Sequence, residues 1–146
     1  MAYKSIVVGT DGSASASRGV EQAIALAKAD GARLVVVTAF EDHGGGPDDR
    51  IPADIRWMIT DRNEAERHAR AARELAAEAG LRDVVVQALA GEAADMLLET
   101  ADDFGADLIV VGSVGLTAAS RFILGSVASS VLHHAPCDVL VAHTHS

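Results

Sequence analysis

Short aliphatic runs alternate along this chain with longer segments in which apolar residues recur at helical spacing. Continuous runs rich in Val, Ile and Leu are typical of strands that are buried on both faces of a parallel sheet. Such runs occupy residues 5–10, 34–40, 84–89, 108–111 and 139–142. Between the first two runs, Val20, Ala23, Ile24 and Ala27 repeat on one helical face until Gly31, a residue that commonly ends helices. The pattern predicts five strands that alternate with four helices.

The second predicted helix is alanine-rich and ends at Gly80. Asp61 followed three positions later by Glu64 is a variant of the capping box, with Asp in the Ser/Thr role, and it predicts a helix start at Asp61. An earlier start is the alternative, because Pro52 precedes further apolar residues and Pro is favoured near the first helical position.

Residues 41–60 interrupt this rhythm. Their first part, Glu41 to Asp49, is polar, acidic and rich in glycine. A surface loop is the simpler interpretation, and a lid over a bound ligand is the functional alternative.

Two further helices are expected over residues 91–105 and 125–134, and Pro136 stops the second of them. The alternation of strands and helices predicts an α/β fold, a doubly wound sheet with right-handed crossovers, as one domain over residues 1–146. In such a sheet, ligands bind beyond the carboxyl ends of the strands, at the point where the winding reverses.

Composition narrows the function classes. Hydrophobic residues form 49% of the chain and aromatic residues only 3%, which predicts an aliphatic core. The net charge of −9 argues against a nucleic-acid partner, because such a partner requires a basic face. The single cysteine, Cys137, excludes an internal disulfide and a cysteine-based zinc site. We recognise neither a secretory signal nor an apolar run long enough for a membrane span, so we expect a cytoplasmic protein without a membrane partner.

The stretch from Gly112 to Ser130 carries the strongest functional signal. Gly112 and Gly115 enclose two residues, nine residues follow, and then come Gly125 and Ser126. A predicted strand precedes this stretch, and a predicted helix begins within it, at about Gly125. Because glycine has no Cβ, a ligand can approach the main chain closely along such a loop.

The start of that last helix is expected to bind an anion. The N–H groups of Gly125, Ser126 and Val127 lack helical partners and lie at the positive end of the helix dipole, an arrangement suited to phosphate. The hydroxyl groups of Ser113 and Ser126 would add donors. An ordinary connection between strand and helix is the alternative.

Four segments together resemble the universal stress protein family, and the resemblance covers nearly the whole chain except residues 41–60. The chain is most similar to the subgroup with the ATP-binding motif, in its actinobacterial single-domain form. The segments are the glycine spacing above, Thr10-Asp11-Gly12-Ser13, Asp107-Leu108-Ile109-Val110-Val111-Gly112 and His134-Ala135-Pro136-Cys137.

The resemblance implies a five-stranded parallel sheet of order 3-2-1-4-5, of the Rossmann-like, adenine nucleotide α-hydrolase-like kind. It also implies an adenine nucleotide between the first and fourth strands. The nucleotide-binding residues that it implies are Thr10, Asp11, Thr38, Ala39, Gly112, Ser113, Gly115, Gly125, Ser126 and Val127. Among them, Thr38 and Ala39 would lie near the adenine, which backbone groups would read. Asp11 has two interpretations, a turn-capping carboxylate or a ligand contact.

The implied ligand is ATP or cyclic AMP, with Mg²⁺ as an option beside ATP. Many family members carry a basic or polar residue where this chain has Val114, and the difference favours a nucleotide with fewer charges. Cyclic AMP, which some members of the family bind, is therefore a candidate.

We expect a binding module without catalytic residues. The chain has no P-loop lysine and no GxGxxG sequence, and Arg121 is the only cation within the glycine loop. His133 and His134 suit the end of a helix, His68 is expected on an exposed helix face, and no metal site is expected from the histidines. A slow ATPase or nucleotide-dependent transferase is one alternative, and a protein-interaction dimer with a vestigial nucleotide cleft is another.

The last predicted strand lies at a sheet edge. An apolar edge must be covered or paired. The resemblance implies antiparallel pairing with the same strand of a second copy, which gives a homodimer through Val139, Leu140 and Val141.

Overall fold

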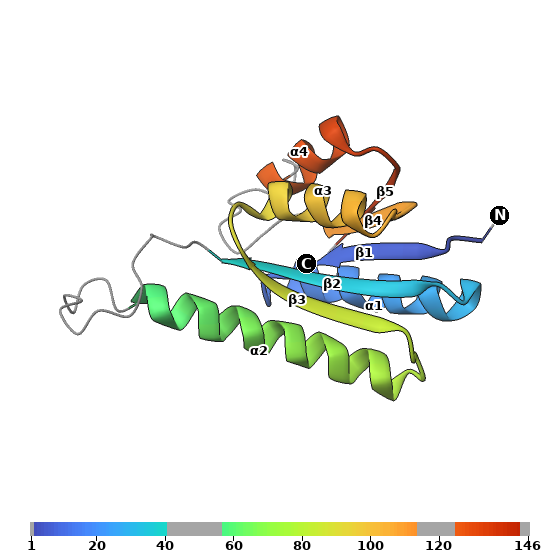
Figure 1. Cartoon of the computed structure of the whole chain (residues 1–146), viewed down its shortest axis with the longest axis horizontal. Helices are drawn as coiled ribbons and strands as arrows, with labels where there is room; N and C mark the ends of the chain where they lie inside the picture. The colour runs from blue at the N-terminus through green and yellow to red at the C-terminus, as the bar shows by residue number, and fades with distance from the viewer. Residues whose placement is uncertain (1, 41–56, 114–124, 144–146) are drawn as a thin grey trace.

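The computed structural model of this chain describes residues 2–40, 57–113 and 125–143. Within these ranges, strands and helices alternate in the predicted order (Figure 1). The elements are β1 (Ser5–Gly9), α1 (Ala14–Asp30), β2 (Arg33–Phe40), α2 (Trp57–Glu78), β3 (Val84–Ala90), α3 (Ala93–Asp103), β4 (Leu108–Gly112), α4 (Ser126–His134) and β5 (Asp138–Ala142).

All five strands are parallel, and their order is β3-β2-β1-β4-β5. The predicted fold class and strand order are therefore confirmed. β1 lies at the centre, where Val8 pairs with Val36 of β2 on one side and with Val110 of β4 on the other. The chain winds outward from β1 in one direction and then, from β4, in the other. The carboxyl ends of β1 and β4 consequently meet where the winding reverses.

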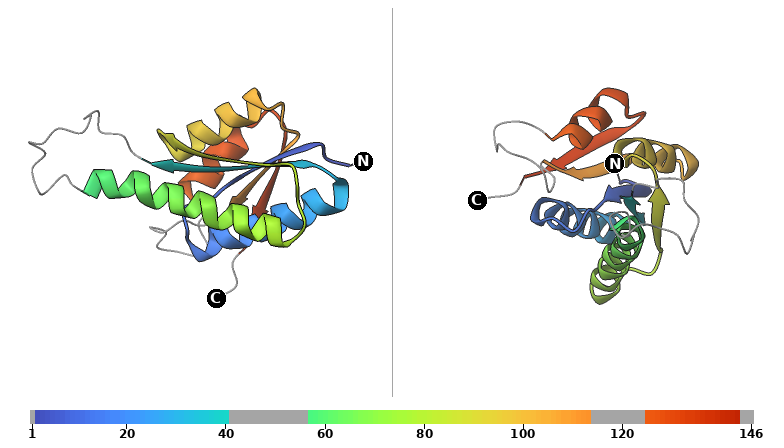
Figure 2. Two further views of the ribbon diagram at one scale, coloured as in Figure 1. Left: turned by 60° about the horizontal axis from the view of Figure 1, so that its bottom comes forward. Right: turned by 90° about the vertical axis from the view of Figure 1, so that its left-hand side faces the viewer.

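The sheet is covered on both faces (Figure 2). α1 and α2 pack on one face through a cluster that includes Ile6, Val8 and Leu34. α3 and α4 pack on the other face, where Val7 and Ile109 belong to the cluster. Successive residues of the central strands thus point to opposite faces, and both faces are apolar. This explains why the strands read as continuous aliphatic runs in the sequence.

The helices end largely where the sequence indicates. Gly31 adopts φ 68° directly after α1, and the next amide, of Ala32, donates to the carbonyl of Ala27 at 2.9 Å. α4 ends at His134, as expected. The Nδ1 atoms of His133 and His134 each lie 2.9 Å from the carbonyl oxygen four residues earlier. Across the described ranges, none of the helices has the length and apolar content needed to cross a membrane.

The start of α2 differs from the sequence prediction. The helix begins at Trp57, so the predicted start at Asp61 is wrong and the earlier alternative is the better one. A capping box is only a local preference for a helix start. Residues 57–60 are already helical, so the helix passes through Asp61 without a break. The predicted loop 41–60 is correspondingly shorter at its end. Its remainder, with Pro52, lies outside the described residues.

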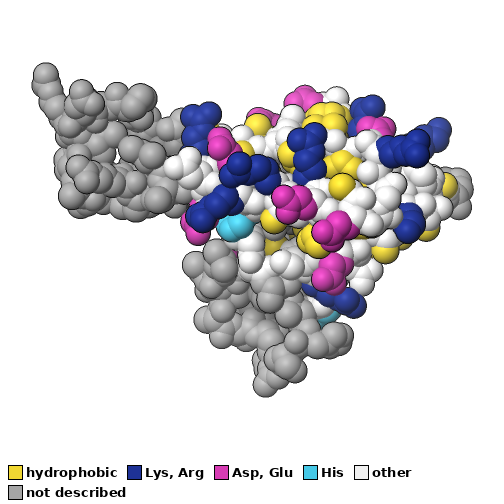
Figure 3. Space-filling model, turned by 90° about the horizontal axis from the view of Figure 1, so that it is seen from below, with side chains coloured by type: hydrophobic (Ala, Val, Ile, Leu, Met, Phe, Trp, Pro, Cys, Tyr) yellow, Lys and Arg dark blue, Asp and Glu magenta, His cyan; other side chains and the backbone are white. Residues whose placement is uncertain are grey.

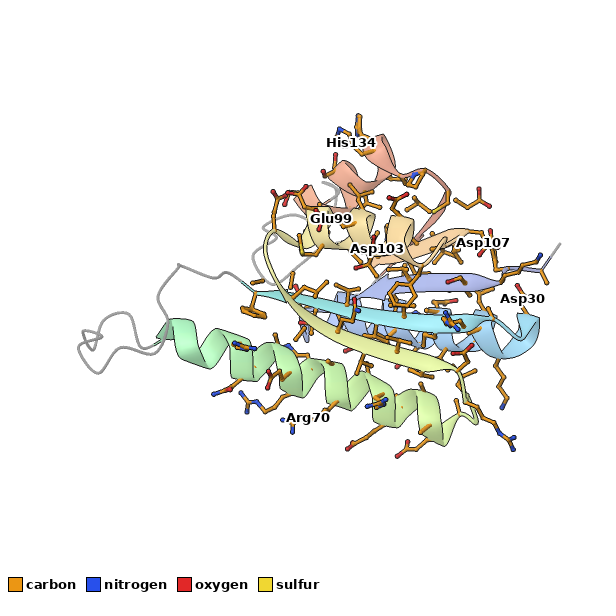
Figure 4. The ribbon with its side chains drawn as sticks, viewed as in Figure 1. Asp30, Arg70, Glu99, Asp103, Asp107 and His134 are labelled. Atoms are coloured by element: carbon orange, nitrogen blue, oxygen red, sulfur yellow. The ribbon has the colours of Figure 1, made fainter. Side chains whose placement is uncertain are left out.

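Acidic side chains gather at the amino ends of the strands. The carboxylate of Asp107 accepts hydrogen bonds from the amides of Lys4 and Ser5 at 3.0–3.2 Å. Asp30 accepts from the amide of Tyr3 at 2.8 Å. Figure 4 shows Asp30 and Asp107 at the end of the sheet near the N-terminus. These carboxylates therefore lie at the opposite edge from the carboxyl ends of β1 and β4.

Candidate functional site

The candidate site lies at the carboxyl ends of β1 and β4. The last pair between these strands joins Val8 and Val110. Thr10 follows the end of β1, and Gly112 is the last residue of β4, so both lie at the carboxyl ends of these neighbouring strands. Asp11 and the start of the glycine loop therefore both follow strands that are neighbours in the sheet.

The turn between β1 and α1 is closed by its own side chains. Thr10 Oγ1 accepts a hydrogen bond from the amide of Gly12 at 3.2 Å, and Asp11 Oδ1 accepts from the amide of Ser13 at 2.9 Å. Ser13 is the N-cap of α1, and its side chain accepts from the amide of Ala16 at 3.1 Å. Asp11 therefore has the turn-capping role that was one of its two interpretations. Its carboxylate also adds an acceptor to this edge of the sheet.

Ala39 presents its backbone toward this turn. The carbonyl of Val37 accepts from the amide of Thr10 on the β1 side, whereas the carbonyl of Phe40 accepts from Gly91 on the β3 side. Because the backbone groups of a strand alternate in direction, those of Ala39 point to the β1 side, beyond the last β1–β2 pair. Thr38 is 2% exposed and its backbone points to β3. Of the two residues expected near the adenine, Ala39 is thus the better placed.

The start of α4 is only partly as expected. Gly125 is the N-cap, and no side chain caps the helix. Its amide is not free, because it donates to the carbonyl of Ser113 at 2.8 Å. The amide of Ser113 in turn donates to Ala142 of β5 at 3.0 Å. The predicted anion site therefore loses the Gly125 donor and retains the first-turn amides of Ser126 and Val127, which have no helical acceptor.

The two helix starts at this edge are chemically opposite. The turn before α1 carries a carboxylate, and side-chain oxygens satisfy its amides. The N-cap of α4 has no side chain, and the exposed Ser126 adds a hydroxyl group at its first position. One end of a ligand would therefore meet acceptors and the other end would meet donors.

Several expected site residues lie outside the described residues: Gly115, Val114 and Arg121. Within the described ranges, no group of three or more His, Cys, Asp or Glu side chains could hold a metal ion. Thr10, Asp11, Ala39, Gly112, Ser113, Gly125, Ser126 and Val127 all lie at the carboxyl edge of the sheet or in the turns that follow it.

His68 also belongs to this region, and the prediction that it lies on an exposed helix face is wrong. It is half-buried rather than exposed, and its ring lies against Gly12, which adopts φ 80°. The sequence offered one weak signal, since His68 follows Ala65 by three positions and precedes Ala72 by four, and both alanines are buried. Its partner could not be read from the sequence, because Gly12 belongs to a distant turn.

Charges of both signs are mixed on the face that α1 and α2 form. Figure 3 shows Lys and Arg side chains interspersed there with Asp and Glu. Arg62 contacts Glu66 at 3.5 Å and also lies 5.9 Å from the centre of the Phe40 ring, and Arg18 contacts Glu21 at 3.7 Å. This face therefore does not present one continuous basic surface.

Comparison with known proteins identifies relatives along the whole chain. The profile of the Universal stress protein family matches residues 2–143. A universal stress protein of Mycobacterium tuberculosis is 38% identical over 144 residues, which are 98% of each chain. A universal stress protein solved in complex with cAMP is 36% identical, with a TM-score of 0.71 over 99% of this chain and 100% of the other. One from Archaeoglobus fulgidus, in complex with dAMP, is 27% identical, with a TM-score of 0.71 over 97% and 98%. These matches confirm the resemblance seen in the sequence, and the chain belongs to the universal stress protein family.

Proposed function

We propose that this protein binds an adenine nucleotide across the carboxyl ends of β1 and β4 and acts as a nucleotide-responsive stress module of the cytoplasm. The observation that carries the proposal is the pair of opposite helix starts, a carboxylate-bearing turn before α1 and a start of α4 without a side-chain cap. Relatives crystallised with cAMP and dAMP support the choice of an adenine nucleotide.

Each part of the nucleotide has a matching group. The N–H and C=O of Ala39 would read the edge of the adenine. Asp11 would accept hydrogen bonds from ribose hydroxyl groups. Thr10 would help to hold the turn that carries Asp11, because its Oγ1 accepts from the amide of Gly12. The amides of Ser126 and Val127 would donate to phosphate oxygens at the positive end of the α4 dipole. Gly112, Ser113, Gly115 and Gly125 would leave room for the phosphate.

The donors suit one phosphate better than three. Among the described residues of the site, two first-turn amides and the hydroxyl of Ser126 can satisfy a single phosphate, and the amide of Gly125 is already engaged by Ser113. A triphosphate needs cations to offset its charge, and the chain carries a net charge of −9. We therefore expect AMP or cyclic AMP to bind more tightly than ATP.

The described part of the site offers few protein ligands for Mg²⁺. Asp11 is the one carboxylate of the β1–α1 turn, and its Oδ1 already accepts a hydrogen bond from the amide of Ser13, while Mg²⁺ is usually held by one or two carboxylates together with substrate phosphates. Mg²⁺ would then be held chiefly by the phosphates of ATP. EDTA should accordingly weaken ATP binding and leave cyclic AMP binding unchanged.

Calorimetric titration with cyclic AMP, AMP, ADP and ATP tests the proposal. We expect Asp11→Asn to weaken binding about tenfold, because an amide accepts less strongly than a carboxylate and an ordinary charged hydrogen bond is worth about 1.5–3 kcal/mol. Glu99→Gln, the same change of charge on the exposed face of α3, is the matched control. Absence of heat with all four nucleotides, or equal affinities for Asp11→Asn and the control, would contradict the proposal.

A measurement of turnover separates binding from catalysis. Phosphoryl transfer depends on positioned groups that neutralise the charge of the phosphates, and the sequence has no P-loop lysine to do so. We expect no ATP hydrolysis above background in the purified protein. Hydrolysis that disappears in Asp11→Asn would instead favour a slow ATPase.

We also propose that two copies pair through β5. β5 is an edge of the sheet, its residues Val139, Leu140 and Val141 are only partly buried, and Leu132 of the adjacent α4 is 46% exposed. Pairing of β5 with its equivalent in antiparallel fashion would cover these side chains. Analytical ultracentrifugation should show a dimer, and Leu140→Lys should shift it to monomer. A wild-type monomer at all concentrations would overturn this arrangement.

A further inference from the structure

The tip of the His68 ring fills the space that a side chain at position 12 would occupy. A Cβ built on Gly12 would collide with Nε2 and would lie 2.6 Å from Cε1 and 2.9 Å from Cδ2. Gly12 also adopts φ 80°, a conformation that L side chains rarely adopt. Two separate features thus favour glycine at position 12: the positive φ of the backbone and the lack of space beside the imidazole ring.

The ring is held by an element that packs firmly on the sheet. Ala65, Ala69, Ala72 and Ala76 of α2 are each no more than 4% exposed and face the sheet. His68 lies between two of these positions on the helix and is half-buried. α2 covers β2 and β3 beside α1 (Figure 1). The imidazole therefore extends from a fixed helix to the turn between β1 and α1.

At its start, that turn is tied to β2 by one hydrogen bond, from the amide of Thr10 to the carbonyl of Val37 at 3.0 Å. Its two internal hydrogen bonds, from the amide of Gly12 to Thr10 Oγ1 and from the amide of Ser13 to Asp11 Oδ1, are both local. Neither is fully buried, so water competes with each of them. A contact from a separate helix restricts the turn in a way that local bonds cannot.

We propose that His68 is a positioning residue for the nucleotide site: its ring buttresses Gly12 and so holds the turn that presents Asp11. This inference rests on the proposed function. The ring itself does not need to touch the nucleotide. Its effect on affinity comes from the order that it gives to Asp11 before the ligand arrives, which lowers the entropy lost on binding.

The proposal predicts how substitutions at His68 change affinity. His68→Ala removes the buttress and should weaken cyclic AMP or AMP binding about threefold to tenfold, in the range of measured couplings between contacting residues. His68→Gln should retain most of the affinity, because its amide nitrogen reaches roughly the place of Nε2. Arg70→Ala is the matched control, since Arg70 lies on the same helix and points away from the sheet (Figure 4).

A double-mutant cycle isolates the contact. Gly12→Ala in the wild type introduces both backbone strain and a collision with the ring, whereas in His68→Ala it introduces the strain alone. The loss of affinity caused by Gly12→Ala should therefore be smaller in the His68→Ala background than in the wild type. Equal losses in the two backgrounds would show that the ring and the turn are independent, and would overturn the proposal.

Amide hydrogen exchange tests the buttress without any ligand. In the nucleotide-free protein, the amides of Gly12 and Ser13 should exchange several-fold faster in His68→Ala, and at wild-type rates in Arg70→Ala. If the wild type binds no nucleotide, the proposed function fails, while this exchange measurement still decides whether His68 holds the turn. Unchanged exchange in His68→Ala would overturn the proposal. Faster exchange with unchanged nucleotide affinity would also overturn it, because the contact would then be structural alone.

Discussion

The amide of Gly125 donates a 2.8 Å hydrogen bond to the carbonyl oxygen of Ser113. This bond joins the two ends of the segment between β4 and α4. It fixes the start of α4 relative to the end of β4 through main-chain atoms alone. The next amides along α4, those of Ser126 and Val127, are thereby placed at the same edge of the sheet as Asp11.

A side chain that caps α4 should compete with phosphate. Gly125 adopts φ −61° and ψ 155°, which any residue can adopt, so its substitution introduces no backbone strain. In Gly125→Asp, the carboxylate would accept from the first-turn amides and repel phosphate. We expect nucleotide affinity to fall more than tenfold while the free energy of unfolding stays equal or rises by a few tenths of a kcal/mol. Calorimetry and thermal unfolding of the same preparations measure both.

Gly125→Ala separates the steric effect of a side chain at position 125 from the effect of a carboxylate there. Alanine adds a methyl group but no acceptor, so it should weaken binding less than Asp does if capping is the main effect. Equal losses of affinity for the two variants would show that the space beside Gly125 matters, and that capping of the helix by the introduced carboxylate does not.

Gly19 offers a way to stabilise the fold. It lies inside α1, and a Cβ there would meet Gly112 N at 3.6 Å and Val110 Cγ1 at 3.7 Å, which are ordinary contacts. Glycine within a helix costs about 0.5–1 kcal/mol relative to alanine. Gly19→Ala should therefore raise the melting temperature by about 1–4 °C.

Gly9→Ala is the opposing control for that gain. Its Cβ would lie 3.0–3.1 Å from the methyl groups of Leu97, a side chain that is only 2% exposed. The crowding should lower the melting temperature. A gain at Gly9, or a loss at Gly19, would show that the packing between these helices and the sheet differs from that described.

Asp107 should contribute to stability above acidic pH. Burial alone would raise the pKa of its carboxyl group, but the hydrogen bonds from the amides of Ser5 and Lys4 outweigh burial, and the pKa is lowered. A lowered pKa in the folded state stabilises the protein above the ordinary value of about 3.9, and the contribution is lost as the pH falls through the folded value. Asp107→Asn should lower the melting temperature at neutral pH, and the difference from wild type should shrink below about pH 4.

Asp103→Asn provides the control for this pH dependence, because Asp103 is exposed at the end of α3. Its melting curves should follow those of the wild type throughout. A difference for Asp107→Asn that persists unchanged in acid would mean that charge at this position is unimportant.

Tyr3 should titrate above the ordinary range. The hydrogen bond that its hydroxyl donates to Asp138 at 3.0 Å is the main cause that raises its pKa, and burial and nearby carboxylates add to it. The raised pKa favours the neutral phenol, so its contribution is present below about pH 10 and is lost as the pH rises through the folded value. Because Tyr3 is the only tyrosine, phenolate absorbance reports it alone. Asp138→Asn should lower the midpoint, and an unchanged midpoint would exclude the hydrogen bond as the cause.

The sheet was predictable because its signals are local and redundant. Five aliphatic runs, each separated by a helical pattern, leave few arrangements other than a doubly wound sheet, and a strand buried on both faces has to lie near the centre. The central position of β1 follows from Ile6, Val7 and Val8, which are all fully buried. The order of the strands came from the family resemblance and not from the runs themselves.

The details of the site were less predictable because they depend on contacts between distant segments. The amide of Gly125 was expected to be free, and only the folded chain brings the carbonyl of Ser113 to it. His68 was expected to face solvent, and only the packing of α2 brings it to Gly12. Sequence patterns identify the residues of a turn, whereas tertiary contacts decide which of their polar groups remain available.

The central place of β1 between β2 and β4 has a consequence for how the protein matures. A chain that has emerged only as far as β3 holds Asp11 and Ala39 but lacks every phosphate donor proposed above. Nucleotide would therefore recognise only the finished sheet, and by mass action it would stabilise that state alone. Added nucleotide should slow unfolding and should not affect the earliest steps of synthesis and collapse. Bound nucleotide therefore indicates that the chain has completed its fold.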